Sequence, residues 1–179
     1  RQVMKWTASG FELPQVSVNL SVKQLERPEF VETLQKILEE TGIEPGRLKL
    51  EITESVVMAV DDAFTLLDRL RKIGISLALD DFGTGYSSLS YLKMLPVQQL
   101  KIDRSFVIGI GQNPEDEAII RSVMALAQSL NFEVVAEGVE TAEQAAFLSA
   151  SGCHQLQGFL HGSAVAPAEF RARWSSLPR

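Results

Sequence analysis

Short apolar runs rich in β-branched residues recur along the chain, and segments with a different pattern separate them. Runs of this length and composition are typical of buried strands. The last run has the weakest pattern. The predicted strands are Val16–Leu20, Leu48–Ile52, Ile75–Asp80, Gln99–Asp103, Glu133–Glu137 and His154–Gln157.

Between these runs, apolar residues recur every three or four positions, which predicts amphipathic helices. Asp61 is a predicted N-cap, Gly42 and Gly74 are predicted C-terminal stops, and Thr141 with Gln144 has the spacing of a capping box. The predicted helices are Glu29–Thr41, Asp61–Ile73, Ser87–Leu95, Pro114–Leu130 and Thr141–Ser151, and a last one that starts near Pro167 and includes Phe170 and Trp174.

Alternating strands and helices indicate parallel β/α units, which fit an open doubly wound sheet or a (β/α)₈ barrel. An open sheet gathers its ligand at one switch point, whereas a barrel gathers residues from the ends of many strands. Every predicted strand has a polar residue at or near its carboxyl end, and this favours the barrel. These residues are Asn19, Glu51, Asp80, Asp81, Lys101, Asp103, Glu137 and Gln157.

The six predicted strands do not close an eight-stranded barrel. We therefore expect a TIM-like barrel that lacks about its first two strands, with Val3, Met4 and Trp6 at the end of a helix. The sequence does not begin with Met, so we expect residues 1–179 to be one domain truncated at its N-terminus. The unpaired edges of such a barrel invite association.

Composition narrows the class of protein. A hydrophobic content of 45% in 179 residues predicts a globular domain. No apolar run approaches the ~20 residues that span a bilayer, and no signal-peptide pattern is present. The single Cys153 suits a reducing compartment, so we expect a cytoplasmic domain, either free or as the cytoplasmic part of a membrane-anchored protein. The net charge of −6 argues against binding a nucleic-acid polymer through a basic surface.

Two adjacent carboxylates, Asp80 and Asp81, end the most hydrophobic predicted strand. Like charges repel and are costly to bury unless cations neutralise them. The donors available are oxygen atoms, which suit Mg²⁺ or Mn²⁺ better than zinc. A carboxylate shared by two ions would support a two-metal site that activates water. The candidate ligands are Asn19, Glu51, Asp80, Asp81 and Glu137.

Lys101 is a candidate for stabilising charge or positioning water beside these ligands. The turn Gly83-Thr84-Gly85 would allow a ligand to approach the backbone closely. The residues alone leave two classes of enzyme open. One is metal-assisted hydrolysis of a phosphodiester, and the other is enolate chemistry with a lysine base and Mg²⁺.

Six segments of the chain resemble the EAL domain family in order and spacing: SVNLS, LEITES, LDDFGTGYSSLSYL, LKIDRSFV, VAEGVET and LQGF. The resemblance covers nearly the whole chain. It implies a (β/α)₈-type barrel with one antiparallel strand. It also implies a bacterial signalling phosphodiesterase that converts cyclic di-GMP to linear pGpG with Mg²⁺ or Mn²⁺, and that Ca²⁺ inhibits.

The same resemblance implies roles for individual residues. Asn19, Glu51 and Asp80 resemble ligands of a first metal, Asp80 resembles a bridging carboxylate, and Asp81 resembles a ligand of a second metal. Lys101 resembles the lysine that holds or activates the catalytic water.

Other site residues follow from the same motifs. Glu137 resembles a Glu near the second metal and the water, and Gln157 resembles a residue that orders the water. Glu54 matches a Glu that anchors the loop after the third predicted strand, where Gly83, Thr84 and Gly85 lie, and Glu140 matches the second Glu of the family's EGVE motif. For Glu54, Glu140 and Asp103 we favour structural support over direct catalysis.

Two features depart from the family's pattern. The Glu-Ala-Leu motif, whose Glu ligates the first metal, is absent from the chain, and Ala164 and Ala166 stand where the family often has Pro-x-Pro. We therefore expect the 179 residues alone to be inactive or nearly so. The alternative function is a catalytically inactive EAL-like module that binds cyclic di-GMP or a protein partner. The family also implies a homodimer and attachment to sensory or GGDEF-type domains.

Overall fold

The computed structural model describes residues 2–11, 15–60, 62–85 and 89–175. Its strands form one sheet in which each strand pairs in parallel with the next strand along the chain. A strand order without reversal is the order of a barrel, not of a doubly wound sheet. The strands are β1 (Val16–Asn19), β2 (Leu48–Thr53), β3 (Ser76–Phe82), β4 (Gln99–Ile102), β5 (Glu133–Ala136) and β6 (Gln155–Leu156).

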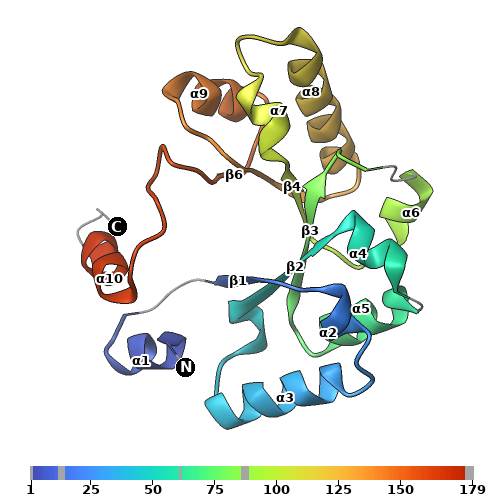
Figure 1. Cartoon of the computed structure of the whole chain (residues 1–179), viewed down its shortest axis with the longest axis vertical. Coiled ribbons are helices and arrows are strands. Elements are labelled where there is room, and N and C mark those ends of the chain that lie inside the picture. The colour runs from blue at the N-terminus through green and yellow to red at the C-terminus, as the bar shows by residue number, and fades with distance from the viewer. Residues whose placement is uncertain (1, 12–14, 61, 86–88, 176–179) are drawn as a thin grey trace.

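The sheet curls into an incomplete barrel, and helices cover its outer side (Figure 1). This confirms the predicted fold class. The helices are α1 (Gln2–Ala8), α2 (Val22–Leu25), α3 (Phe30–Thr41), the 3₁₀ turn η1 (Pro45–Arg47), α4 (Glu54–Ala59), α5 (Ala63–Lys72), α6 (Leu89–Met94), α7 (Arg104–Ile108), α8 (Pro114–Ser129), α9 (Ala142–Ala150) and α10 (Pro167–Ser175).

Local sequence signals fix several helix ends as predicted. Gly42 ends α3 in the left-handed region with φ of 65°, a conformation that glycine adopts at little cost. Thr141 begins α9, and its Oγ1 accepts a hydrogen bond from the N–H of Gln144 at 3.2 Å, which completes the predicted capping box. The N-cap of α5 is Asp62, one residue after the predicted Asp61, which lies outside the described residues. Ser87, the predicted start of the helix that ends at Leu95, also lies outside the described residues.

Three short helices, α2, α4 and α7, were not predicted, because each is too short to show a helical period. Two of them begin directly after a strand at a side-chain cap. Thr53 Oγ1 accepts from the N–H of Val56 at 3.4 Å to begin α4. Asp103 Oδ1 accepts from the N–H of Ser105 at 2.9 Å to begin α7, a structural-support role of the kind we favoured for this residue.

The last predicted strand is shorter than expected. Only Gln155–Leu156 has strand geometry, but the pairing with β5 continues on both sides of it. The N–H of His154 donates to the carbonyl of Val134 at 3.2 Å, and the N–H of Gln157 donates to the carbonyl of Ala136 at 2.8 Å. The run from His154 to Gln157 therefore follows β5, as predicted, with irregular ends.

Alternation along the strands divides the sheet into two faces. Leu50 and Ile52 of β2, Leu77 and Leu79 of β3, and Leu100 of β4 are at most 3% exposed and belong to the main hydrophobic core. The intervening residues of the same strands point into the barrel. Burial of the apolar face against the helices therefore fixes which side chains line the interior.

Helices α1 and α10 lie side by side at the left of Figure 1, where the two terminal segments of the chain meet. Trp6 packs against Phe11 and Phe170, with ring centroids 5.6 and 5.7 Å apart, and Arg171 donates to the carbonyl of Ser9. These aromatic contacts hold α10 near α1 rather than on the sheet.

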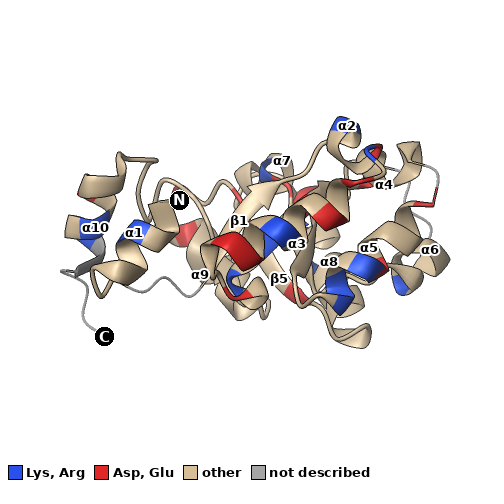
Figure 2. Cartoon of the chain, turned by 90° about the horizontal axis from the view of Figure 1, so that it is seen from below, with Lys and Arg blue, Asp and Glu red and all other residues tan. Residues whose placement is uncertain are grey.

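Charges are mixed over the outer helices (Figure 2). On α5, Asp68 pairs with Lys72 at 2.8 Å, and Arg69 reaches across to Glu32 of α3. This arrangement gives α3 and α5 no broad basic face. Among the described residues, no helix is both long and apolar enough to cross a membrane.

The burial of β4 predicts a large loss of stability on truncation. Leu100→Ala removes a side chain that is 0% exposed, so we expect the free energy of unfolding to fall by about 2–5 kcal/mol in urea titrations. The matched control is Met94→Ala, because Met94 is 65% exposed, and its effect should stay below about 0.5 kcal/mol. Similar losses in both variants would contradict this assignment of the core.

Candidate active site

A buried ammonium group lies among three carboxylates inside the barrel. Lys101 Nζ lies 2.7 Å from Glu51 Oε2, 2.9 Å from Asp80 Oδ1 and 2.6 Å from Glu137 Oε1. The Lys101 side chain is 4% exposed. The four residues come from β2, β3, β4 and the end of β5, so the structure brings together four of the predicted site residues.

The small side chain of Ala78 makes this arrangement possible. Lys101 on β4 must reach across β3 to contact Glu51 on β2, and Ala78 is the β3 residue in register with Glu51. A larger side chain would fill that space, because neighbouring strands lie only about 4.8 Å apart. The same gap lets Lys49 Nζ donate to Gln99 Oε1 at 2.9 Å.

Asp80 and Asp81 lie together because of a bulge that the sequence pattern does not show. Adjacent residues of a regular strand point to opposite faces. Between the pairs Leu79–Leu100 and Phe82–Ile102, β3 has one residue more than β4, and Asp81 has a positive φ of 54°.

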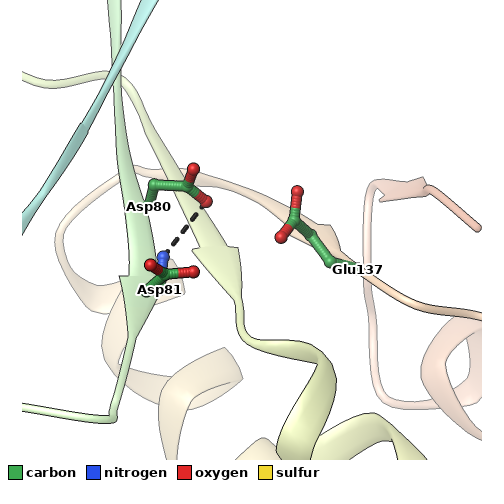
Figure 3. A group of neighbouring side chains, drawn as sticks. All are labelled: Asp80, Asp81 and Glu137. Atoms are coloured by element: carbon green, nitrogen blue, oxygen red, sulfur yellow. Dashed lines mark hydrogen bonds between the residues drawn. The ribbon is translucent and has the colours of Figure 1, made fainter. Parts of the chain in front are cut away.

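The extra residue turns the carboxylate of Asp81 to the same side as that of Asp80. Carboxylate oxygens of Asp80, Asp81 and Glu137 all lie within 4.8 Å of one another, and the N–H of Asp81 donates to Asp80 Oδ1 at 3.1 Å (Figure 3). Three hard oxygen donors at this spacing fit a divalent cation such as Mg²⁺ or Mn²⁺. Glu51 is not one of these three residues, but its Oε2 lies 2.7 Å from Lys101 Nζ.

Burial and crowding shift the ionisation of the cluster. Burial raises the pKa of Asp81, and the neighbouring charges of Asp80 and Asp103 raise it further. Burial also raises the pKa of Glu137, although the Lys101 ammonium opposes this. Burial by itself would lower the pKa of Lys101, but hydrogen bonds to Glu137, Glu51 and Asp80 outweigh it and raise the pKa above the ordinary 10.5. Lys101 therefore carries a positive charge.

Glu54 connects the loop after β3 to helix α4. Its side chain is buried, and Oε1 accepts a hydrogen bond from the N–H of Gly83 at 3.3 Å. A Cβ atom on Gly85 would lie 2.5 Å from Glu54 Oε2, so only glycine fits there without movement. Thr84 Oγ1 donates to the carbonyl of Asp81 at 2.8 Å. The predicted loop residues thus gather around Glu54 and the end of β3.

Glu140 does not join the acidic cluster but forms an ion pair with Arg104 at 2.8 Å. The Arg104 side chain also packs against Gly138, where an added Cβ would lie 2.2 Å from Arg104 Cγ. Arg104 therefore supports the turn that follows Glu137. Sequence reasoning missed this residue, since an arginine at the start of a short helix gives no signal by itself.

Asn19 and Gln157 lie near the carboxyl ends of the two edge strands, and both are exposed. Asn19 is in register with Glu51. The backbone of Gln157 pairs on both sides, with its N–H donating to Ala136 and its carbonyl accepting from Val139 at 3.0 Å. Their predicted roles toward a metal and a water stay predictions.

An incomplete β/α barrel with its acidic residues at one end of the strands belongs to the class of barrel proteins that build their sites at that face. The family model of the EAL domain matches residues 1–164, so the chain belongs to the EAL domain family. This confirms the resemblance seen in the motifs.

Two relatives from Pseudomonas aeruginosa show how close the similarity is. The chain is 44% identical over 170 residues to the bifunctional diguanylate cyclase/cyclic di-GMP phosphodiesterase MucR, and the matched region covers 94% of this chain and 25% of MucR. It is 45% identical over 153 residues to the cyclic di-GMP phosphodiesterase NbdA, and the matched region covers 85% of this chain and 20% of NbdA. The chain therefore spans about a quarter or less of these relatives.

Solved structures agree with the fold. A MucR phosphodiesterase in complex with c-di-GMP is 40% identical with a TM-score of 0.89, and the match covers 94% of this chain and 69% of that one. A manganese and cyclic di-GMP complex of Klebsiella pneumoniae BlrP1 is 34% identical with a TM-score of 0.79, and the match covers 88% of this chain and 41% of that one.

The geometry of Lys101 predicts its contribution to stability. Lys101→Met leaves three carboxylates, of which Glu51 and Asp80 are buried, without their shared counter-charge, so we expect a loss of about 3–5 kcal/mol in urea unfolding at pH 7 with EDTA. The control is Lys93→Met, which changes an exposed lysine.

The loss should depend on pH in a defined direction. Burial raises the pKa of Asp81 and of Glu137, and removal of the ammonium that opposes this raises both further. The folded variant therefore binds more protons than the unfolded chain, and it loses stability as pH rises. The deficit of Lys101→Met should therefore shrink toward pH 4. A deficit that equals that of Lys93→Met at pH 7 would contradict the geometry.

Proposed function

We propose that this chain is the catalytic domain of a phosphodiesterase that hydrolyses cyclic di-GMP to linear pGpG in bacterial second-messenger signalling. The observation that carries the proposal is the convergence of Asp80, Asp81 and Glu137 around one position beside Lys101. Membership of the EAL family supports it, as do the names of MucR and NbdA, which are cyclic di-GMP phosphodiesterases.

We assign the cations to the oxygen donors of the cluster. Asn19, Glu51 and Asp80 would hold one Mg²⁺ or Mn²⁺, and Asp80 together with Asp81 would hold a second. Bound divalent cations activate water as a nucleophile and stabilise charge on the phosphoryl group. The BlrP1 complex, which contains manganese and cyclic di-GMP, supports this choice of metal.

The remaining residues orient the reaction. Lys101 directs its N–H bonds at acceptors, so we assign it to holding the attacking water and stabilising negative charge rather than to removing a proton. Glu137 is the carboxylate best placed to accept a hydrogen bond from that water, and Gln157 orders the water from the neighbouring strand end. Hydrolysis breaks the bond between phosphorus and O3′ of one diester, which leaves a 5′-phosphate on linear pGpG.

The surrounding residues act as supports in this proposal. Glu54 holds Gly83 and packs on Gly85, and so fixes the loop that follows Asp81. Glu140 holds Arg104 against the turn after Glu137. Both carboxylates therefore act on the site through the backbone.

We further infer the setting of the domain. Residues 1–179 belong to one EAL domain, which is attached to sensory or GGDEF-type domains and acts in the cytoplasm as a homodimer. The greater length of MucR and NbdA supports the attachment. Exposed apolar side chains near the loop after β3 support a protein contact there: Met58 is 69%, Leu89 is 64% and Met94 is 65% exposed.

The proposed hydrolysis has a direct test. The full-length protein should produce pGpG from cyclic di-GMP in the presence of Mn²⁺, measured by chromatography. Asp80→Asn should lower kcat/KM by at least about 10²-fold because it removes a shared negative ligand. Asp68→Asn is the control, since Asp68 pairs with Lys72 on the outer surface. Micromolar ligand binding without pGpG would favour an inactive binding module instead.

The support role of Glu54 predicts a chemical pattern among its variants. Glu54→Gln keeps an oxygen that can accept from the N–H of Gly83, so kcat/KM should fall by less than about threefold. Glu54→Leu removes the acceptor and should lower kcat/KM by about tenfold or more. Equal, large losses in both variants would instead indicate that the negative charge itself takes part in the reaction.

A further inference from the structure

A second set of polar side chains lies inside the barrel below the acidic cluster, nearer the amino ends of the strands, where Gln99 of β4 is in register with Glu133 of β5. This lower polar layer consists of Lys49, Gln99 and Glu133. Lys49 Nζ donates to Gln99 Oε1 at 2.9 Å, and Gln99 Nε2 donates to Glu133 Oε2 at 3.4 Å. Lys49 and Gln99 are buried, with exposed fractions of 9% and 2%.

The lower polar layer is joined to the acidic cluster through the strands. Lys49 is two residues before Glu51, and Gln99 is two residues before Lys101, so each pair shares a face of its strand. Two residues of a strand span about 7 Å. Charges at this spacing interact appreciably in a poorly solvated interior.

The hydrogen bonds of the lower polar layer leave the charge of Lys49 only partly compensated. The Lys49 ammonium donates to a neutral amide, whereas the Lys101 ammonium contacts three carboxylates directly. Glu133 lies beyond Gln99 and is exposed, so water screens part of its charge and it offsets that of Lys49 only partly. The field of Lys49 therefore reaches Glu51 and its neighbours.

We propose that Lys49 lowers the affinity of the acidic cluster for divalent cations and that Glu133 opposes this effect. This inference rests on the proposed two-metal function and adds a control on it. A buried positive charge below the site repels a cation that binds above it, and a negative charge in the same layer attracts it. Neither residue touches the reacting groups, so both act through the field in the barrel.

The test measures Mn²⁺ binding by titration calorimetry on the full-length protein stripped of metal, without substrate. Lys49→Met should tighten the Mn²⁺ dissociation constant by at least about fivefold, and Glu133→Gln should weaken it by about two- to fivefold. Lys36→Met is the matched control, because Lys36 is an exposed lysine on α3 paired with Glu40. Its dissociation constant should stay within about twofold.

The opposite signs separate this field effect from damage to the fold. Loss of packing would weaken Mn²⁺ binding in both variants, so weaker binding in Lys49→Met would overturn the inference. Because Glu133 is exposed, Glu133→Gln should fold even if Lys49→Met does not, and it keeps the test decisive. An unchanged Mn²⁺ dissociation constant in Glu133→Gln would also overturn the inference. Absence of Mn²⁺ binding by the unsubstituted protein would overturn the proposed function together with the inference. Mn²⁺ binding with a dissociation constant that neither substitution changes would overturn the inference alone.

Discussion

The buried ammonium of Lys101 is the interaction on which the site depends. Moving a charged group out of water costs several kcal/mol even in a relaxed protein interior, and only well-placed partners offset this. Here the partners are Glu51, Asp80 and Glu137, each within 3 Å of Nζ. Because these partners come from different strands, the ammonium can be buried only when the strands are in register.

The hydrophobic core enforces that register. Leu100 and Ile102 of β4 are fully buried against the helices, and Lys101 between them points into the barrel. A slip of one residue would turn Lys101 into the apolar layer and expose the two apolar side chains to the polar interior. Packing energy on one face of the sheet therefore positions chemistry on the other. Ala78 has the complementary task, since its small side chain leaves the path across β3 free.

Sequence patterns predicted the parts of the molecule that repeat. Apolar runs located the strands, helical periods located the long helices, and polar strand ends located Glu51, Asp80, Lys101 and Glu137. What they missed depends on local backbone geometry. No pattern marks the extra residue that turns Asp81, and one-turn helices such as α7 are shorter than the period that would reveal them. The pairing of Arg104 with Glu140 joins the start of α7 to the loop before α9, and only the fold determines that approach.

The charge of the cluster explains why adjacent aspartates can end a buried strand. Four carboxylates, from Glu51, Asp80, Asp81 and Glu137, face a single ammonium, which leaves the cluster with a net charge of about minus three. One divalent cation would leave it negative and repel a phosphodiester. Two would leave it slightly positive, which attracts the single negative charge of that group. The charges of the chain's own residues thus favour two cations over one, and the repulsion between Asp80 and Asp81 is the source of the affinity for both.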